Sequence, residues 1–152
     1  MQERPGLEQV PKFNGENMKF ISNSYNDTIK FAKEYAQTLK VGDVVLLDGD
    51  LGAGKTVFAK GVVEFFSNGN EVAVSPTFTI VNEYRCTPPV YHFDFYRIKS
   101  EDELFAIGIE EYLYGGGICL IEWPERAPNV LADIKCKTIK IKKENNKRVI
   151  EY

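Results

Sequence analysis

The residues with the clearest chemical potential lie in a glycine-rich stretch, Gly49–Thr56, which fits the P-loop pattern G-x-x-x-x-G-K-[ST]. Glycines adopt backbone angles that a side chain forbids, so successive N–H groups in such a loop turn inward around phosphate oxygens. Lys55 is expected to reach the β- and γ-phosphates, and the Thr56 hydroxyl is a natural Mg²⁺ ligand. The predicted nucleotide-binding residues are Gly49, Asp50, Leu51, Gly52, Ala53, Gly54, Lys55 and Thr56.

A P-loop site needs a further acid to hold the Mg²⁺ shell, usually where a neighbouring buried strand ends. Glu122 directly follows the apolar run 118–121, and Asp94 lies within a strand pattern beside polar neighbours. Both acids can reach one site, because open α/β sheets bind ligands at the carboxyl ends of their strands. Plainer interpretations stay open, with Glu122 as a solvated strand end and Asp94 as a partner of Arg97 or His92.

Other polar and aromatic positions lie near these motifs in the sequence. Ser75 and Thr77 offer hydroxyls to a γ-phosphate, as in a switch segment, although an ordinary junction between a strand and a loop explains them equally well. Trp123 follows Glu122 and is therefore expected near the nucleotide, unless it belongs to the core. His92 is the only histidine, and a lone histidine in a strand is more often structural than catalytic.

Strands and helices that alternate along the sequence are expected to position these residues. The apolar run 44–47 predicts a buried strand before the P-loop, and the apolar spacing after the loop predicts a helix. An earlier helix is expected from Tyr25 to Leu39, with Ser24 or Asn26 as its cap. Further elements are expected as strands at 18–22, 71–74, 80–86, 90–97 and 118–121, helices after a cap at Ser100 and at 109–113, and a β-hairpin within 134–152. The pattern predicts an α/β fold, a three-layer P-loop NTPase-like domain with a mixed β-sheet flanked by helices.

Length and composition favour one domain. The 152 residues are 43% hydrophobic, which is enough for one sizeable core and too little for two. We expect residues 1–16 to form a flexible N-terminal tail and residues 17–152 to form a single P-loop ATPase domain that ends in the C-terminal hairpin. No apolar run approaches the roughly 18 residues of a membrane span, and the three scattered cysteines suit a reducing cytoplasm. A net charge of −3 disfavours direct binding of DNA or tRNA.

Four short motifs occur in a fixed order: Gly49–Thr56, Ser75–Thr79 (Ser-Pro-Thr-Phe-Thr), His92–Arg97 (His-Phe-Asp-Phe-Tyr-Arg) and Ile121–Glu125 (Ile-Glu-Trp-Pro-Glu). Together they closely resemble the bacterial TsaE (YjeE) family of small P-loop ATPases. The resemblance implies ATP or ADP and Mg²⁺ as cofactors, and a role in forming N6-threonylcarbamoyladenosine on tRNA next to the anticodon. It also implies that ATP is hydrolysed in association with the proteins TsaD and TsaB, so that the chain meets tRNA only indirectly.

The same resemblance implies roles for individual residues. Because Lys55 is a point charge for phosphate, we also expect it to face solvent when no nucleotide is bound. The implied site residues are Lys55, Asp94 and Glu122 for catalysis, Thr56 and Glu122 for the metal, and Ser75, Thr77 and Trp123 for nucleotide contacts beyond the P-loop.

Three other functions compete with this one. A small GTPase should show D-x-x-G after the P-loop and N-K-x-D for guanine, but no Asp after Thr56 begins the first pattern, and the nearest match to the second, at 146–149, lacks its Asp. A small-molecule kinase usually carries a lid with several arginines, whereas here Arg85, Arg97 and Arg126 are scattered. A nucleotide-binding partner without enzymatic activity stays open, because a P-loop indicates binding and not turnover.

Overall fold

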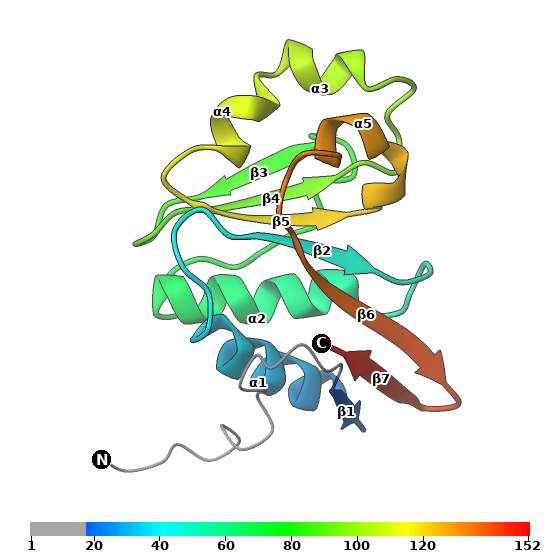
Figure 1. The fold of residues 1–152 in the computed structure, drawn as a ribbon. Helices are drawn as coiled ribbons and strands as arrows, with labels where there is room; N and C mark the ends of the chain where they lie inside the picture. Colours follow the sequence, from blue (N-terminus) through cyan, green and yellow to red (C-terminus); the bar gives the residue numbers. More distant parts are fainter. Residues whose placement is uncertain (1–17) are drawn as a thin grey trace.

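A computed structural model describes residues 18–152 of the chain (Figure 1). It contains a seven-stranded mixed β-sheet with strand order β1-β7-β6-β2-β5-β4-β3 and helices on both faces. The predicted three-layer α/β fold is confirmed. The expected N-terminal tail, residues 1–16, lies outside the described residues, and the domain boundary at residue 17 stays a prediction.

The middle of the sheet is parallel and its two sides are antiparallel. β2 pairs in parallel with β5 and β6, and β4 pairs in parallel with β5. β3 joins β4 antiparallel, while β7 and then β1 continue antiparallel from β6. The strands are β1 (Lys19–Ser22), β2 (Val44–Asp48), β3 (Val81–Tyr84), β4 (Val90–Asp94), β5 (Ile118–Glu122), β6 (Lys137–Glu144) and β7 (Lys147–Glu151).

Two longer helices and several short ones cover the sheet. The longer pair, α1 (Tyr25–Ala36) and α2 (Lys55–Ser67), lies side by side on one face, and the short helices lie on the other (Figure 1). α1 and α2 cross closely, because a Cβ atom added at Gly61 would stand 2.5 Å from the Cβ of Ala32. The short helices are α3 (Asp102–Ala106), α4 (Ile109–Leu113), α5 (Pro128–Leu131) and the 3₁₀ turn η2 (Pro124–Arg126).

The central strands β2, β4 and β5 are largely buried on both faces, so alternate residues along them belong to different cores. Beneath α1 and α2, Leu47 and Leu120 pack with Phe31 and Phe58. On the opposite face, Phe93 and Ile121 belong to a second cluster that the short helices cover. The same alternation turns the even-numbered positions of β4 and β5 toward α2, and the polar residues of the site occupy the last of those positions.

Several predicted elements are confirmed and others need correction. Ser24 caps α1 as expected, since its hydroxyl accepts the Asp27 N–H at 3.1 Å, but the helix ends at Ala36 and not at Leu39. α3 begins after Glu101, so the predicted cap at Ser100 is wrong. The hairpin, the helix at 109–113 and the strands at 18–22 and 118–121 appear close to the expected bounds, whereas the strands predicted at 80–86 and 90–97 are shorter, as β3 and β4.

The strand predicted at 71–74 is wrong, although the segment has the right composition. Val72 and Val74 are 73% and 58% exposed, and no ladder forms along them. Side chains satisfy this backbone instead, because the Val74 N–H donates to the Tyr84 hydroxyl at 2.8 Å and the Asn82 amide donates to the Val74 carbonyl at 3.1 Å. None of the helices within residues 18–152 combines the length and hydropathy that a membrane crossing requires.

Candidate functional site

The P-loop connects the C-terminal end of β2 to the first turn of α2 (Figure 1). Two of its glycines have positive φ, +78° at Gly52 and +112° at Gly54, which a residue with a side chain rarely adopts. Gly49 is required for a different reason, since a Cβ there would stand 2.6 Å from the Ile141 carbonyl oxygen of β6. The loop therefore turns tightly against the sheet and presents the N-terminus of α2, where N–H groups and the helix dipole favour an anion.

The side chain of Lys55 lies buried at this helix start, with only 5% of its surface exposed. Its Nζ atom has no hydrogen-bond partner among residues 18–152 and lies 3.7 Å from the ring centroid of Trp123. Burial lowers the pKa of its ammonium group, and the negative charges of Glu122 and Asp94 partly oppose that shift. The expectation that Lys55 faces solvent is wrong, because the Trp123 ring covers it.

Trp123 reaches this position through an unusual backbone conformation. Its φ of +58° places it in the left-handed region, directly after β5 and before η2, where a bulky residue is a rare and strained exception. The ring also packs on Tyr96, with 4.9 Å between centroids, and Arg126 Cζ lies 5.5 Å from the centroid of that second ring. Two cations and two aromatic rings therefore cluster beside the P-loop.

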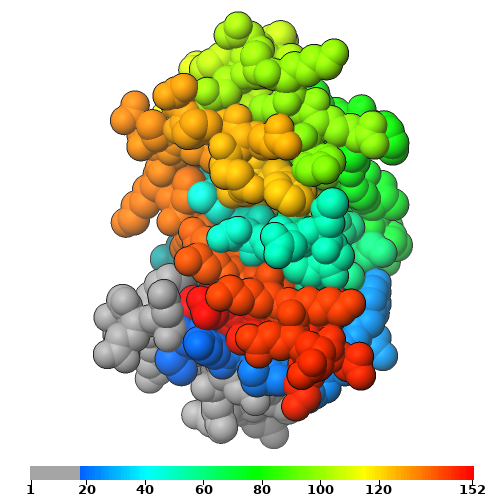
Figure 2. Space-filling model, turned by 90° about the vertical axis from the view of Figure 1, so that its right-hand side faces the viewer, coloured from blue at the N-terminus to red at the C-terminus, as the bar shows by residue number. Residues whose placement is uncertain are grey.

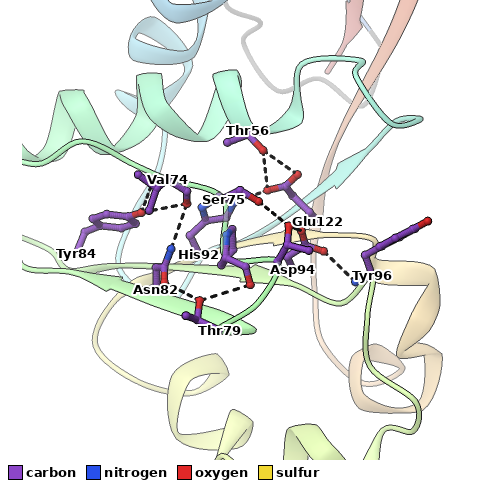
Figure 3. A network of polar contacts seen from close by, with 12 residues as sticks. Thr56, Val74, Ser75, Thr79, Asn82, Tyr84, His92, Asp94, Tyr96 and Glu122 are labelled. Atoms are coloured by element: carbon purple, nitrogen blue, oxygen red, sulfur yellow. Dashed lines mark hydrogen bonds and ion pairs between the residues drawn. The ribbon is translucent and has the colours of Figure 1, made fainter.

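Glu122 ends β5 directly opposite Asp94 of β4, because the two strands run parallel in this register. The residue is 3% exposed, and its carboxylate is held from two sides (Figure 3). The Thr56 hydroxyl lies 3.3 Å from both carboxylate oxygens, and His92 Nε2 lies 2.6 Å from Oε2. The P-loop threonine and the strand acid are thus already adjacent.

Asp94 joins the switch-like segment to the same site. Its Oδ2 accepts a hydrogen bond from the Thr77 hydroxyl at 3.0 Å, and its Oδ1 accepts the Tyr96 N–H at 2.9 Å. The hydroxyls of Ser75 and Thr77 lie 2.6 Å apart, and Figure 3 shows Ser75 close to the two acids. The alternative in which Asp94 pairs with Arg97 or His92 is wrong, because Arg97 lies over the Phe78 ring and His92 contacts Glu122.

Two cavities flank the P-loop, which Figure 2 shows in cyan between the orange-red hairpin of β6 and β7 and the yellow segment after β5. One cavity, of about 260 Å³, holds the acids and Lys55. The other, of about 230 Å³, lies between the first turn of α1, the P-loop and the hairpin, and its lining includes Tyr25, Val57, Asn146 and Arg148. The first cavity is lined by Leu51, Gly52, Gly54, Lys55, Thr56, Val57, Ser75, Thr77, Asp94, Glu122 and Trp123.

The donor set of the first cavity fits a magnesium–nucleotide pair. A buried ammonium group without a hydrogen-bond partner suits a phosphate oxygen, and a hydroxyl beside a carboxylate suits Mg²⁺. Among the described residues no cluster of three or more His, Cys, Asp or Glu side chains is suited to a metal ion. Magnesium bound here would therefore depend on phosphate oxygens, which is how nucleotide sites usually hold it.

Comparison with known proteins identifies the family of this chain. The family model described as "Threonylcarbamoyl adenosine biosynthesis protein TsaE" matches residues 22–150. The chain belongs to the TsaE family. A TsaE protein of Rickettsia prowazekii, named for tRNA threonylcarbamoyladenosine biosynthesis, is 43% identical over 133 residues, covering 84% of this chain and 88% of its own. A TsaE protein of Synechocystis with the same name is 42% identical over 122 residues, covering 77% of this chain and 76% of its own.

A solved structure supports the same membership. The crystal structure of YdiB from Bacillus subtilis superimposes with a TM-score of 0.73 and 34% sequence identity, covering 90% of this chain and 84% of that one. The resemblance seen in the four motifs is therefore confirmed, and the chain is a member of a P-loop family of threonylcarbamoyladenosine biosynthesis.

The four TsaE motifs meet at one end of the sheet, but not every predicted residue lines the cavity. Gly49 packs against β6, and Ala53 is buried with 2% of its surface exposed. Asp50 is exposed, and its carbonyl accepts the Ala53 N–H at 3.0 Å within the loop. Their roles in binding, like the catalytic and metal roles of the other site residues, stay predictions.

Sequence reasoning missed two side chains that the fold brings to the TsaE site. His92 contacts Glu122. It lies two residues before Asp94 on the same strand, and this spacing could have placed both side chains on one face of the sheet. Arg148 donates from Nη2 to the Gly52 carbonyl at 3.3 Å, and no sequence pattern connects β7 with the P-loop. Both contacts depend on strand order and register, which local patterns do not reveal.

Proposed function

We propose that this chain binds and hydrolyses ATP with Mg²⁺, and that it does so as a subunit required for N6-threonylcarbamoyladenosine formation on tRNA, next to the anticodon. The observation that carries the proposal is Lys55 of the P-loop, a buried ammonium group with no hydrogen-bond partner among residues 18–152. A buried charge without a partner is costly in a folded protein. Such a group is best explained by a ligand that brings phosphate oxygens to it.

Lys55 and the side chains around it have different roles in the proposed phosphoryl transfer. Loop N–H groups and Lys55 bind and orient the β- and γ-phosphates, while Thr56 and Glu122 hold the metal. A Mg²⁺ ion held by these two residues would supply positive charge against the negative charge that develops during transfer. Asp94 orients the attacking water, and Thr77, already 3.0 Å from Asp94, brings the switch segment toward the γ-phosphate.

The second cavity is the place for the nucleoside. It shares Gly52, Gly54 and Val57 with the phosphate cavity, so a nucleotide that follows the loop passes from one to the other. Tyr25 offers a half-exposed ring for stacking, and Asn146 and Arg148 offer polar contacts. We expect adenine and not guanine there, because the chain lacks the Asp that completes a guanine-reading N-K-x-D motif.

The proposed activity also depends on partner proteins, which would supply groups that the phosphate cavity lacks. None of the described arginines lines the phosphate cavity, although P-loop enzymes gain roughly 10³ to 10⁵ in rate from such a residue, which can arrive from another protein. Arg97 lies over the Phe78 ring and Arg126 over the Tyr96 ring, which turns both toward other contacts. TsaD and TsaB are the partners that the family resemblance names, and they would also supply the surface for tRNA. A single domain at 17–152 and a cytoplasmic location belong to the same proposal.

The experiment measures ATP turnover by the chain alone and with TsaD and TsaB, together with multiple-turnover modification of tRNA. We expect weak hydrolysis alone, faster hydrolysis with both partners, and no sustained modification when the chain is omitted. Sustained modification without the chain would overturn its proposed role. Full ATPase activity of the isolated chain would overturn the claim that partners complete the site.

Nucleotide choice is tested separately, by competition between ATP and GTP for the isolated chain. Preference for ATP is expected. Equal or tighter binding of GTP would overturn the assignment as an ATPase and favour the GTPase alternative.

A further inference from the structure

His92 is a buried titratable residue that the proposed hydrolysis does not use. It lies on β4 with none of its surface exposed, beneath α2 and two residues before Asp94. Its Nε2 atom lies 2.6 Å from Glu122 Oε2, and its Nδ1 atom is buried without a hydrogen-bond partner among the described residues. The side chain therefore makes one polar contact in the described structure, and that contact is to the predicted metal-site acid.

The proton arrangement follows from these two nitrogens. A carboxylate only accepts hydrogen bonds, so Nε2 must carry a proton to donate to Glu122. A proton on Nδ1 would be a buried N–H without an acceptor, which folded proteins rarely tolerate, whereas an unused lone pair there is less costly. The geometry thus indicates that Nε2–H is the donor to Glu122.

The contact matters because Glu122 has a competing partner nearby. Lys55 and Glu122 line the same cavity, so a positive and a negative side chain face the same small space. Yet no ion pair joins them, and Lys55 Nζ stays without a hydrogen-bond partner in the described part of the chain. The oxygens of Glu122 are engaged by His92 on one side and Thr56 on the other.

We propose that His92 is a positioning residue that holds Glu122 beside Thr56, where Mg²⁺ is to be bound, and away from Lys55, which must stay available for phosphate. This inference rests on the proposed function of the site. Residues that orient a metal-binding carboxylate through a hydrogen bond typically change metal affinity 10- to 100-fold when removed. His92 is not among the residues that line either cavity beside the P-loop, so it acts through Glu122.

The test uses three variants that differ in where they place a donor. His92→Gln carries an amide nitrogen at about the position of Nε2, so it keeps the donor to Glu122. His92→Asn places its amide nitrogen at about the position of Nδ1, too short to reach Glu122, and His92→Leu fills the space without a donor. For each protein, calorimetry gives the affinity for a non-hydrolysable ATP analogue in EDTA and in Mg²⁺, and the ratio of the two affinities reports the metal site alone.

We expect Mg²⁺ to strengthen binding by the unaltered chain, and this gain to fall about 10-fold or more in His92→Leu and His92→Asn. The affinity in EDTA should stay close to its original value in all variants, and His92→Gln should keep most of the Mg²⁺ gain. A purely structural role would instead lower the EDTA affinity and the melting temperature, with no special recovery by Gln. If the Mg²⁺ gain survives in Leu and Asn, the inference is overturned and the proposed function stands.

A chain whose nucleotide affinity does not respond to Mg²⁺ would overturn the metal part of the proposed function itself, and the inference with it.

A second measurement needs no variant and therefore applies even if His92→Leu does not fold. His92 is the only histidine of the sequence, so long-range ¹H–¹⁵N spectra report its ring without ambiguity. A proton on Nε2 and none on Nδ1 is expected, and a neutral ring with its proton on Nδ1 would overturn the inference because Nε2 could not then donate.

Discussion

Replacing Lys55 with methionine should separate stability from function. Lys55 is 5% exposed, its Nζ atom has no hydrogen-bond partner in the described structure, and burial lowers its pKa. A lowered pKa means that the charged form is less favourable in the folded chain than in the unfolded chain. Lys55→Met should therefore make the nucleotide-free protein more stable while it abolishes ATP binding.

The expected change in the free energy of unfolding is the difference between two opposing effects of the substitution. Removing a buried charged donor that lacks a partner relieves about 3 kcal/mol, at the upper end of the usual range. Losing its contact with the Trp123 ring, 3.7 Å away, costs about 2 kcal/mol at a desolvated site, and the methionine sulfur recovers part of that through its own contact with the ring. The expected net gain is about 1 kcal/mol, or about 3 °C in melting temperature for a chain of this size.

The direction of the Lys55 pKa shift also determines how the stability of the protein changes with pH. Between the lowered pKa of folded Lys55 and the ordinary value of 10.5, the unfolded chain binds more protons at this position than the folded one. The penalty is thus fully present below the folded pKa and is relieved as the pH rises toward 10.5. The stability advantage of Lys55→Met over the unaltered chain should accordingly be greatest near neutral pH and shrink at alkaline pH.

The assay is urea or thermal unfolding without nucleotide, in EDTA and in a buffer free of phosphate, with ATP binding measured in parallel. Lys30→Met on α1 is the matched control, because that lysine is exposed and its removal should change stability little. Destabilisation of Lys55→Met by 1 kcal/mol or more would refute the reasoning from burial, and ATP binding at the original affinity would refute the assignment of the phosphate site.

Three further predictions concern the neighbouring side chains. Glu122→Ala should weaken Mg²⁺-dependent nucleotide binding, whereas Asp94→Ala should spare binding and remove turnover; titration with MgADP decides, and loss of binding in Asp94→Ala alone would reverse the two roles. Trp123 is the only tryptophan, so its fluorescence should change when phosphate reaches Lys55, and an unchanged spectrum at saturating ATP would contradict that contact. Arg148→Ala should weaken ATP binding more than it weakens binding of inorganic triphosphate, because Arg148 lines the cavity assigned to the nucleoside; equal losses would place it with the phosphates.

The P-loop and the acid at the end of β5 were predictable because local sequence fixes both. The pattern G-x-x-x-x-G-K-[ST] after an apolar strand is typical of a phosphate-binding loop. Glu122 comes directly after four apolar residues, which is typical of a buried strand that ends on an acid. The strand predicted at 71–74 failed for a complementary reason. Its valines have strand propensity, but propensity needs a neighbouring strand, and side chains of Asn82 and Tyr84 satisfy that backbone instead.

The contacts that were not predictable depend on how distant segments meet. Lys55 is buried because Trp123 adopts a left-handed backbone conformation that no propensity favours. His92 meets Glu122 only because β4 and β5 pair in parallel with Asp94 opposite Glu122. Arg148 reaches Gly52 only because β6, after a long connection, lies beside β2 and brings β7 with it.

The order of the strands also affects how the chain is made. Among the strands that the structure describes, β1 comes first in the sequence, and its one neighbour in the sheet is β7, which comes last. A growing chain can build β2, β4 and β5 around α2 early, but β1 lacks this partner until β7 has been synthesised. A chain that stops before β7 would leave both β1 and one side of β6 with open backbone donors and acceptors, which are templates for aggregation. Termination before β7 should therefore yield insoluble protein and not a smaller folded domain.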